Sequence, residues 1–142
     1  MRWIGPYRID QLLDGMLSDK FPKPPESESV YLVSLKPWET KPTSECDSLY
    51  VGGNTGRSPR FRTRIGDLVA DAFGFFSNAT GHHSGGQSIN AFCRENKLNP
   101  KGLFIGSLEG CECARCAENE LFERLDPKLN KNRPARCRIH RT

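Results

Sequence analysis

Apolar and polar positions along the chain predict a small domain that mixes strands with helices. Short apolar runs typical of buried strands lie at residues 30–35, 48–52 and 102–108. Apolar residues at helical spacing lie at residues 59–73, 87–97 and in a last segment that carries Glu118 and ends at Pro127. The resulting β-β-α-α-β-α order predicts an α/β (α+β) fold, with a small three-stranded, mostly antiparallel sheet flanked by helices.

Residues 1–28, which precede the first predicted strand, are predicted to lie outside the core domain. Residues 9–17 carry apolar side chains at helical spacing, which predicts a short amphipathic helix. Pro24 and Pro25 then favour a linker, because adjacent prolines prevent regular structure. We therefore expect a helical arm and linker at residues 1–28, a core domain at 29–130 and a basic tail at 131–142.

One acidic residue lies on the apolar side of the last predicted helix. At ~100° per residue, Leu121, Phe122 and Leu125 form one stripe, and Glu118 lies in its middle. A carboxylate that points toward a core needs a buried partner or a metal ion. The plainer alternative is that the helix dipole favours an acidic residue near the helix start.

Composition excludes several classes of protein. With 142 residues and ordinary apolar content, the chain is long enough for one domain with its own core. No apolar run approaches the ~20 residues that a membrane span needs, and residues 1–6 lack the apolar centre of a secretion signal. We therefore expect a cytoplasmic protein in a reducing compartment, without a membrane partner. The net charge of +4 permits a nucleic-acid partner without requiring one.

The six cysteines are predicted to be reduced, because a chain that is not secreted rarely carries a disulfide framework. Two pairs have the spacing of zinc ligands, namely Cys113-x-x-Cys116 and Cys137-x-x-His140. They bracket a helix about 20 Å long, which an extended segment over residues 131–136 can span on its return. A structural Cys₃His zinc clamp is one interpretation, and a cluster of reduced thiols beside a basic tail is the other.

A further pattern is spread over most of the chain. Tyr31 in Val30-Tyr31-Leu32 and Tyr50 in Tyr50-Val51-Gly52 lie on the first two predicted strands. Four polar residues follow in the sequence. They are Arg64 on a predicted helix, His83 in a loop, Glu118 on the last predicted helix and Asn130 after the closing proline. This order resembles the GIY-YIG nuclease superfamily over residues 29–130. The resemblance implies that Asn130 fixes the backbone beneath the site.

The resemblance also implies a Mg²⁺- or Mn²⁺-dependent DNA endonuclease that hydrolyses phosphodiester bonds with a single metal ion. Glu118 would hold the hydrated ion, since Mg²⁺ prefers hard oxygen ligands, and the ion would stabilise the phosphate and the leaving oxygen. Arg64 would fork two hydrogen bonds onto phosphate oxygens. In this scheme Tyr31 activates the attacking water, Tyr50 orients the water or the phosphate, and His83 relays the proton.

Each of these residues also has a plainer interpretation. Strand tyrosines are usually packing residues, Arg64 could pair with Asp67 one turn further on, and a histidine in a glycine-rich loop is usually exposed. The second function hypothesis is therefore a catalytically inactive DNA-binding module with the same fold. The third is a zinc-stabilised protein-interaction domain. An active enzyme would serve restriction, repair or a mobile element.

DNA contacts are expected from basic residues outside the six-residue pattern. The candidates are Arg57, Arg60, Arg62, Lys128, Lys131, Arg136 and Arg138. Such phosphate contacts set affinity and salt dependence rather than sequence preference. Cutting both strands with one active site per chain requires two chains or two encounters, so a homodimer is one expectation.

Overall fold

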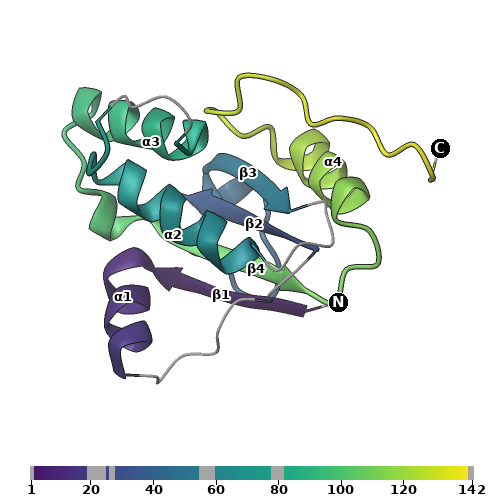
Figure 1. Ribbon diagram of the computed structural model, residues 1–142, viewed down its shortest axis with the longest axis horizontal. Coiled ribbons are helices and arrows are strands. Elements are labelled where there is room, and N and C mark those ends of the chain that lie inside the picture. The colour runs from purple at the N-terminus through teal and green to yellow at the C-terminus, as the bar shows by residue number, and fades with distance from the viewer. Residues whose placement is uncertain (1, 19–24, 26–27, 55–59, 78–81, 141–142) are drawn as a thin grey trace.

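The computed structural model describes residues 2–18, 25, 28–54, 60–77 and 82–140, and its centre is a four-stranded antiparallel sheet (Figure 1). Across the sheet, the strands are β1 (Arg2–Arg8), β4 (Phe104–Glu109), β2 (Ser29–Ser34) and β3 (Ser48–Asn54). The helices are α1 (Ile9–Ser18), α2 (Phe61–Ala72), α3 (Ser84–Glu95) and α4 (Ala114–Leu125). Two short 3₁₀ helices are η1 (Ser44–Cys46) and η2 (Pro100–Gly102). The α+β class is therefore confirmed. Among the described residues, no helix combines the length and apolarity needed to cross a membrane.

The predicted count of three strands is wrong, because β1 adds a fourth at the edge of the sheet. Residues 2–8 were expected in a helical arm, but they pair antiparallel with β4. The register of this pair shifts between Ile4 and Tyr7, where Gly5 and Pro6 interrupt the strand. Proline is tolerated only at edges and irregularities of a sheet, and here it hides the strand from pattern analysis. The helix expected after it is confirmed as α1.

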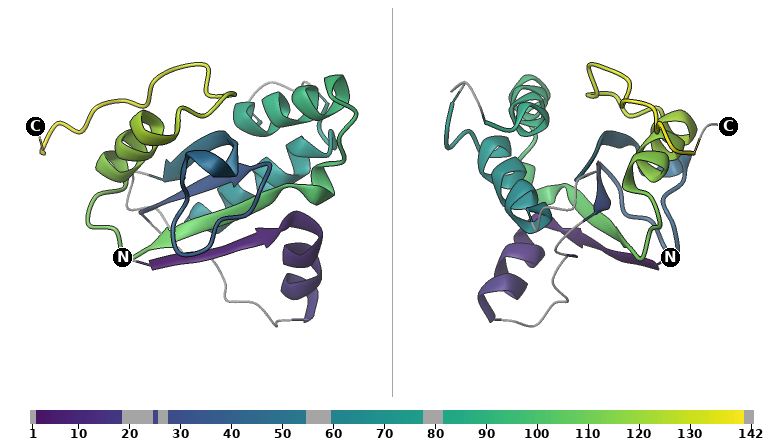
Figure 2. Two further views of the ribbon diagram at one scale, coloured as in Figure 1. Left: turned by 180° about the vertical axis from the view of Figure 1, so that it is seen from behind. Right: turned by 45° about the vertical axis from the view of Figure 1, so that its right-hand side comes forward.

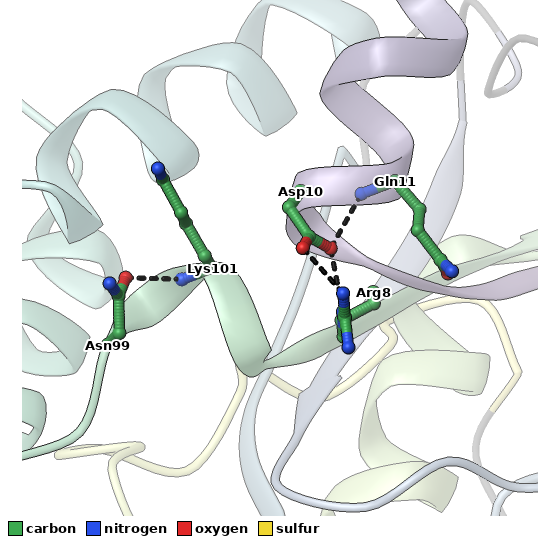
Figure 3. A network of polar contacts seen from close by, with 5 residues as sticks. All are labelled: Arg8, Asp10, Gln11, Asn99 and Lys101. Atoms are coloured by element: carbon green, nitrogen blue, oxygen red, sulfur yellow. Dashed lines mark hydrogen bonds and ion pairs between the residues drawn. The ribbon is translucent and has the colours of Figure 1, made fainter.

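The turn from β1 into α1 is held by a local polar network (Figure 3). The Arg8 guanidinium donates to both carboxylate oxygens of Asp10, at 2.7 Å each. The same carboxylate accepts the Gln11 backbone N–H at 2.7 Å, which satisfies a free donor of the first helical turn. The Ile9 N–H donates to the Leu103 carbonyl at 2.8 Å, so α1 is tied to the chain that enters β4.

The two faces of the sheet carry different helices, because successive strand residues point to opposite sides. Val30 and Leu32 of β2 pack in one cluster with apolar residues of α4. Tyr31 and Val33 pack in the other cluster, with α1, α2 and α3. Figure 2 shows α2 and α3 on the side of the sheet opposite to α4. β2 is one of the two inner strands, and all six of its residues are buried.

The chain that leaves α4 covers the open edge of β3. The backbone N–H of Lys128 donates to the Ser48 carbonyl at 3.2 Å, and that of Leu129 donates to the Leu49 carbonyl at 2.8 Å. These bonds satisfy strand groups that would otherwise be exposed at the edge of the sheet. They also place the next residue of the chain beside the middle of β3.

The tail then runs back along the outer side of α4 (Figures 1 and 2). Arg133 forms an ion pair with Glu123, and the Asn119 side chain donates to the Ala135 carbonyl at 2.9 Å. Further along, Cys137 reaches the first turn of α4. The return path that a clamp across this helix requires is therefore present.

Candidate functional site

Two tyrosines lie side by side on the face of the sheet that α2 and α3 cover. Tyr31 of β2 is directly opposite Gly52 of β3, and Tyr50 is two residues earlier on the same strand. The Tyr31 and Tyr50 ring centroids are 6.1 Å apart. A Cβ on Gly52 would overlap the Tyr31 hydroxyl and lie 2.9 Å from Cε1 of Tyr50. Glycine at position 52 therefore makes room for the tyrosine pair, and a glycine inside a strand is a sequence signal for such close approach.

His83 joins the two tyrosines from the start of α3. It is the N-cap residue, and α3 begins three residues earlier than the predicted residue 87 because of this cap. Its backbone N–H donates at 2.8 Å to a carboxylate oxygen of Asp71, a fully buried residue of α2. Its ring centroid lies 6.1 Å from that of Tyr31 and 5.8 Å from that of Tyr50. The imidazole is thus fixed over both phenols.

The hydrogen bonds of His83 assign its tautomer. Nδ1 accepts the backbone N–H of Gly86 at 3.2 Å, so the proton of a neutral ring must be on Nε2. Nε2 lies 2.6 Å from the Tyr31 hydroxyl. Burial lowers the pKa of His83 to about 4, and the Arg64 guanidinium contributes to that fall. At neutral pH the imidazole is therefore uncharged and donates to the Tyr31 oxygen.

Arg64 and Glu118 share this site electrostatically with the two phenols. Burial raises the pKa of Tyr31 well above its usual value, while Arg64 opposes the rise and Glu118 adds to it. Burial likewise raises the pKa of Tyr50, and the same two charges act on it in the same directions. Burial also raises the pKa of the Glu118 carboxyl, against the effect of the Arg115 and Arg64 guanidiniums. One guanidinium and one carboxylate, from helices on opposite faces of the sheet, are thus close enough to influence both phenols.

Asn130 fixes the strand that carries Tyr50. Its side chain accepts the Val51 N–H at 2.9 Å and donates to the Val51 carbonyl at 2.8 Å. The other side of the Tyr50 ring meets the first turn of α3, where a Cβ on Gly85 would overlap it. Tyr50 therefore has little freedom to move, and contacts bring Tyr31, Tyr50 and His83 together with Asn130 directly behind them.

The predicted DNA contacts fall into two groups. Arg60 and Arg62 are exposed at the start of α2, whereas Arg57 lies outside the described residues. The other group is exposed on the chain after α4 and comprises Lys128, Lys131, Arg136 and Arg138.

A second polar centre lies at the first turn of α4, where the tail returns. The ligand atoms of Cys113, Cys116, Cys137 and His140 all lie within 4.8 Å of one another, so the cluster could hold a metal ion such as zinc. The two C-x-x-C and C-x-x-H turns are similar, because the N–H of Cys116 donates to Cys113 Sγ and the N–H of His140 donates to Cys137 Sγ, each at 3.4 Å. Backbone N–H groups near His140 lower the pKa of the Cys137 thiol to about 6.

Two of the separations between these atoms match those of a tetrahedral zinc site. Bonds of ~2.3 Å to sulfur and ~2.0 Å to nitrogen put two sulfurs about 3.8 Å apart, and sulfur and nitrogen about 3.5 Å apart. Cys113 Sγ lies 3.7 Å from Cys137 Sγ, and Cys137 Sγ lies 3.4 Å from Nδ1 of His140. Cys137 is therefore already at metal-ligand separation from Cys113 and His140, and the remaining pairs lie within 4.8 Å.

Comparison of the chain with protein-family models, curated proteins and solved structures finds no match. The resemblance to the nuclease superfamily therefore stays a prediction that depends on the six residues and their arrangement. Sequence reasoning missed two supporting residues, Asp71 and Gly52. Asp71 lies among apolar residues on the inner side of α2, and an acidic residue in that position was a detectable signal.

Proposed function

We propose that the protein is a divalent-metal-dependent DNA endonuclease of the GIY-YIG type, which hydrolyses phosphodiester bonds at the site around Tyr31. One observation carries the proposal. Two phenols and an imidazole lie together at one position, and the charges of a guanidinium and a carboxylate from two further helices act on them. This combination is unusual for a structural core, whereas phosphodiester hydrolysis can use such groups to accept a proton, neutralise the phosphate and bind a metal ion.

Arg64 and Glu118 have complementary roles toward the phosphate. Arg64 is exposed on α2, where its planar guanidinium can take two phosphate oxygens. Glu118 would hold the Mg²⁺ or Mn²⁺ ion, which when bound would supply charge neutralisation at the phosphate and the leaving oxygen. A single carboxylate fits Mg²⁺, which keeps several of its waters and is often bound through one or two carboxylates and the substrate phosphate. Burial that raises the pKa of Glu118 also favours a cation beside it.

Tyr31 and His83 would act as a pair. Because the His83 Nε2–H donates to the Tyr31 oxygen, the imidazole stabilises negative charge on that phenol. In this tautomer the lone pair is on Nδ1 and is engaged by the cap of α3, so His83 orients Tyr31 rather than taking its proton. Tyr50, held by Gly85 and by the strand fixed through Asn130, would position the phosphate or the water.

Incubation of supercoiled plasmid with the protein and Mg²⁺ tests the proposal. We expect nicked or linear product with the wild type and none in the presence of EDTA. Glu118→Gln should abolish cleavage while the circular-dichroism spectrum stays that of the wild type. Glu120→Gln is the matched control, because Glu120 is on the same helix but is paired with Arg124 at the surface. Cleavage by Glu118→Gln at the wild-type rate would exclude the scheme.

A catalytically inactive DNA-binding module is the second candidate, and the burial of Tyr31 favours it. Its side chain has no exposed surface, so an attacking water reaches the phenol only if the site opens. The same plasmid assay separates the two candidates. Retarded but intact plasmid with Mg²⁺ would support the binding module.

The ion suited to the Cys/His cluster is a structural Zn²⁺. Four protein ligands fill a tetrahedral shell and leave no position for a reacting water, which is the pattern of structural rather than catalytic zinc. Metal analysis of protein purified without added zinc should find one equivalent per chain. Folded protein without bound zinc would remove this part of the proposal.

A further inference from the structure

We propose that Phe75 is a stacking contact for a nucleobase of DNA bound at the candidate site. This inference depends on the proposed function and extends it from the phosphate backbone to the bases. Phe75 lies in the turn after α2, and 78 % of its surface is exposed. Its ring is therefore available to a partner, because an aromatic side chain offers a large apolar face for stacking.

The turn that presents Phe75 is rigid. The Phe75 N–H donates to the Ala70 carbonyl at 3.1 Å, and the Gly74 N–H donates to the Asp71 carbonyl at 2.9 Å. Gly74 has a left-handed φ of 77°, so these bonds form the Schellman motif that ends many helices. The Asn90 side chain of α3 fixes the same turn, since it donates to the Ala72 carbonyl at 2.9 Å.

Phe75 departs from this motif at the one position where packing is expected. The residue after the left-handed glycine commonly folds back onto the last turn of its helix. Phe75 occupies that position, yet its ring is in solvent rather than against Val69 and Ala70. The backbone is therefore ordered by hydrogen bonds, while the side chain is left free to contact another molecule.

Two ring contacts link Phe75 to the residue that precedes His83 of the candidate site. Its ring centroid lies 4.9 Å from that of Phe76 in an edge-to-face pair. Phe76 stacks on His82 with centroids 3.8 Å apart and planes 18° apart. His82 is the neighbour of His83, whose ring is hydrogen-bonded to Tyr31. We therefore expect a DNA strand bound at the candidate site to extend past the exposed ring.

A nucleobase fits the exposed Phe75 ring better than a second protein chain does. One phenylalanine buries about 150–250 Å², whereas a specific protein interface needs roughly 1,000 Å² or more. Bases stack on single aromatic side chains in proteins that bind unpaired strands, and apolar wedges enter between base steps in duplexes. The area of a single exposed ring therefore suits one stacked base.

Two substitutions of Phe75 separate stacking from simple apolar contact. Phe75→Trp keeps a flat ring, and Phe75→Leu keeps apolar bulk without one. Both are made in the Glu118→Gln background, so that bound DNA is not cut, and binding of a fluorescein-labelled single-stranded oligonucleotide is followed by anisotropy. We expect Phe75→Leu to weaken binding by about tenfold, the order typical of one stacked base, and Phe75→Trp to bind as well as its parent. Equal affinity of all three proteins, or no binding by any, would overturn the proposal.

The tryptophan variant also reports directly on the contact. Stacking of a base on the indole at position 75 should quench the fluorescence that this tryptophan adds to the protein. The quenching is measured when the oligonucleotide saturates the protein. Fluorescence that stays unchanged at saturation would overturn the proposal. So would analytical ultracentrifugation showing a wild-type homodimer that becomes monomeric in Phe75→Leu. The proposed function has a separate readout, because plasmid cleavage by the wild type does not depend on the outcome at Phe75.

Discussion

The site around Tyr31 and the Cys/His cluster both gather residues that are distant in sequence, but different forces hold them. The Tyr31 site is built on one of the two inner strands of the sheet, and its two tyrosines are packed in or against the main core. The cluster joins the first turn of α4 to a tail whose basic residues are exposed. Folding of the core is therefore enough to assemble the Tyr31 site, whereas the Cys/His cluster depends on what its thiols bind.

The hydrogen bonds of the two centres show the same contrast. His83 is held by Asp71 and Gly86 and reaches Tyr31 at 2.6 Å, so its backbone N–H and both ring nitrogens have fixed partners. In the cluster, the bonds are N–H to sulfur contacts of 3.4 Å, which are weak on their own. A metal ion is the natural source of the missing stabilisation, because its binding energy adds to folding. Packing therefore holds the side chains of the Tyr31 site in place, whereas those of the Cys/His cluster would be held by a bound ion.

The largest effect on stability is expected at the packed site. Gly52→Ala forces a methyl group against the Tyr31 hydroxyl and the Tyr50 ring, and we expect the free energy of unfolding to fall by about 3 kcal/mol. Gly66→Ala is the matched control. Nothing lies within 4 Å of its Cβ, and alanine in this exposed helix should add about 0.5–1 kcal/mol. Urea unfolding measures both, and equal behaviour of the two variants would contradict the packed geometry.

The pH dependence of stability tests the neutral imidazole. The pKa of His83 is lowered to about 4 in the folded protein, below the ordinary value of ~6.5 expected after unfolding. Between these values the unfolded chain binds the extra proton, so stability is full above about pH 6.5 and is lost as pH falls toward 4. The loss attributable to His83 should be on the order of 2–3 kcal/mol.

His83→Asn is the matched variant, because asparagine can still cap α3 but does not titrate in this range. The difference in unfolding free energy between wild type and variant should therefore shrink as pH is lowered from 7 to 4. A difference that stays constant over this range would show that His83 is not held neutral.

Removal of metal should act on the tail and leave the sheet almost unchanged. A zinc chelator, or Cys137→Ser, is expected to increase trypsin cleavage after Lys131 and Arg136 by about tenfold, since locally opened segments are cut first. Cys93→Ser is the control, because Cys93 is buried on α3 away from the cluster. Tail cleavage that is insensitive to the chelator would mean that packing alone holds the tail, as it does the Tyr31 site.

The smallest expected effect is a gain in stability at Glu118. Burial raises the pKa of this carboxyl, so its charged form destabilises the metal-free folded protein at neutral pH. Glu118→Gln should therefore increase the free energy of unfolding by about 0.5–1 kcal/mol in EDTA. Glu120→Gln should instead lose about 0.3–0.5 kcal/mol, because it breaks an exposed pair with Arg124. A loss of stability in both variants would contradict the burial argument.

Local sequence patterns predicted most of the strands and helices but missed contacts made over long distances in the chain. The strands around Tyr31 and Tyr50 and the helix of Glu118 follow from apolar periodicity. Strand β1 was missed because Gly5 and Pro6 interrupt it and its partner β4 lies about a hundred residues away. The cap by His83 was missed because it depends on the ring nitrogen meeting the Gly86 N–H, which no spacing rule encodes.

On the proposed function, the Tyr31 site cleaves phosphodiester bonds without help from the Cys/His cluster. The most direct measurement is the rate of Mg²⁺-dependent plasmid nicking by the wild type, Glu118→Gln and Cys137→Ser in parallel. We predict a loss of roughly a thousandfold for Glu118→Gln and a rate within about tenfold of the wild type for Cys137→Ser. Nicking that persists in Glu118→Gln but disappears in Cys137→Ser would contradict the account.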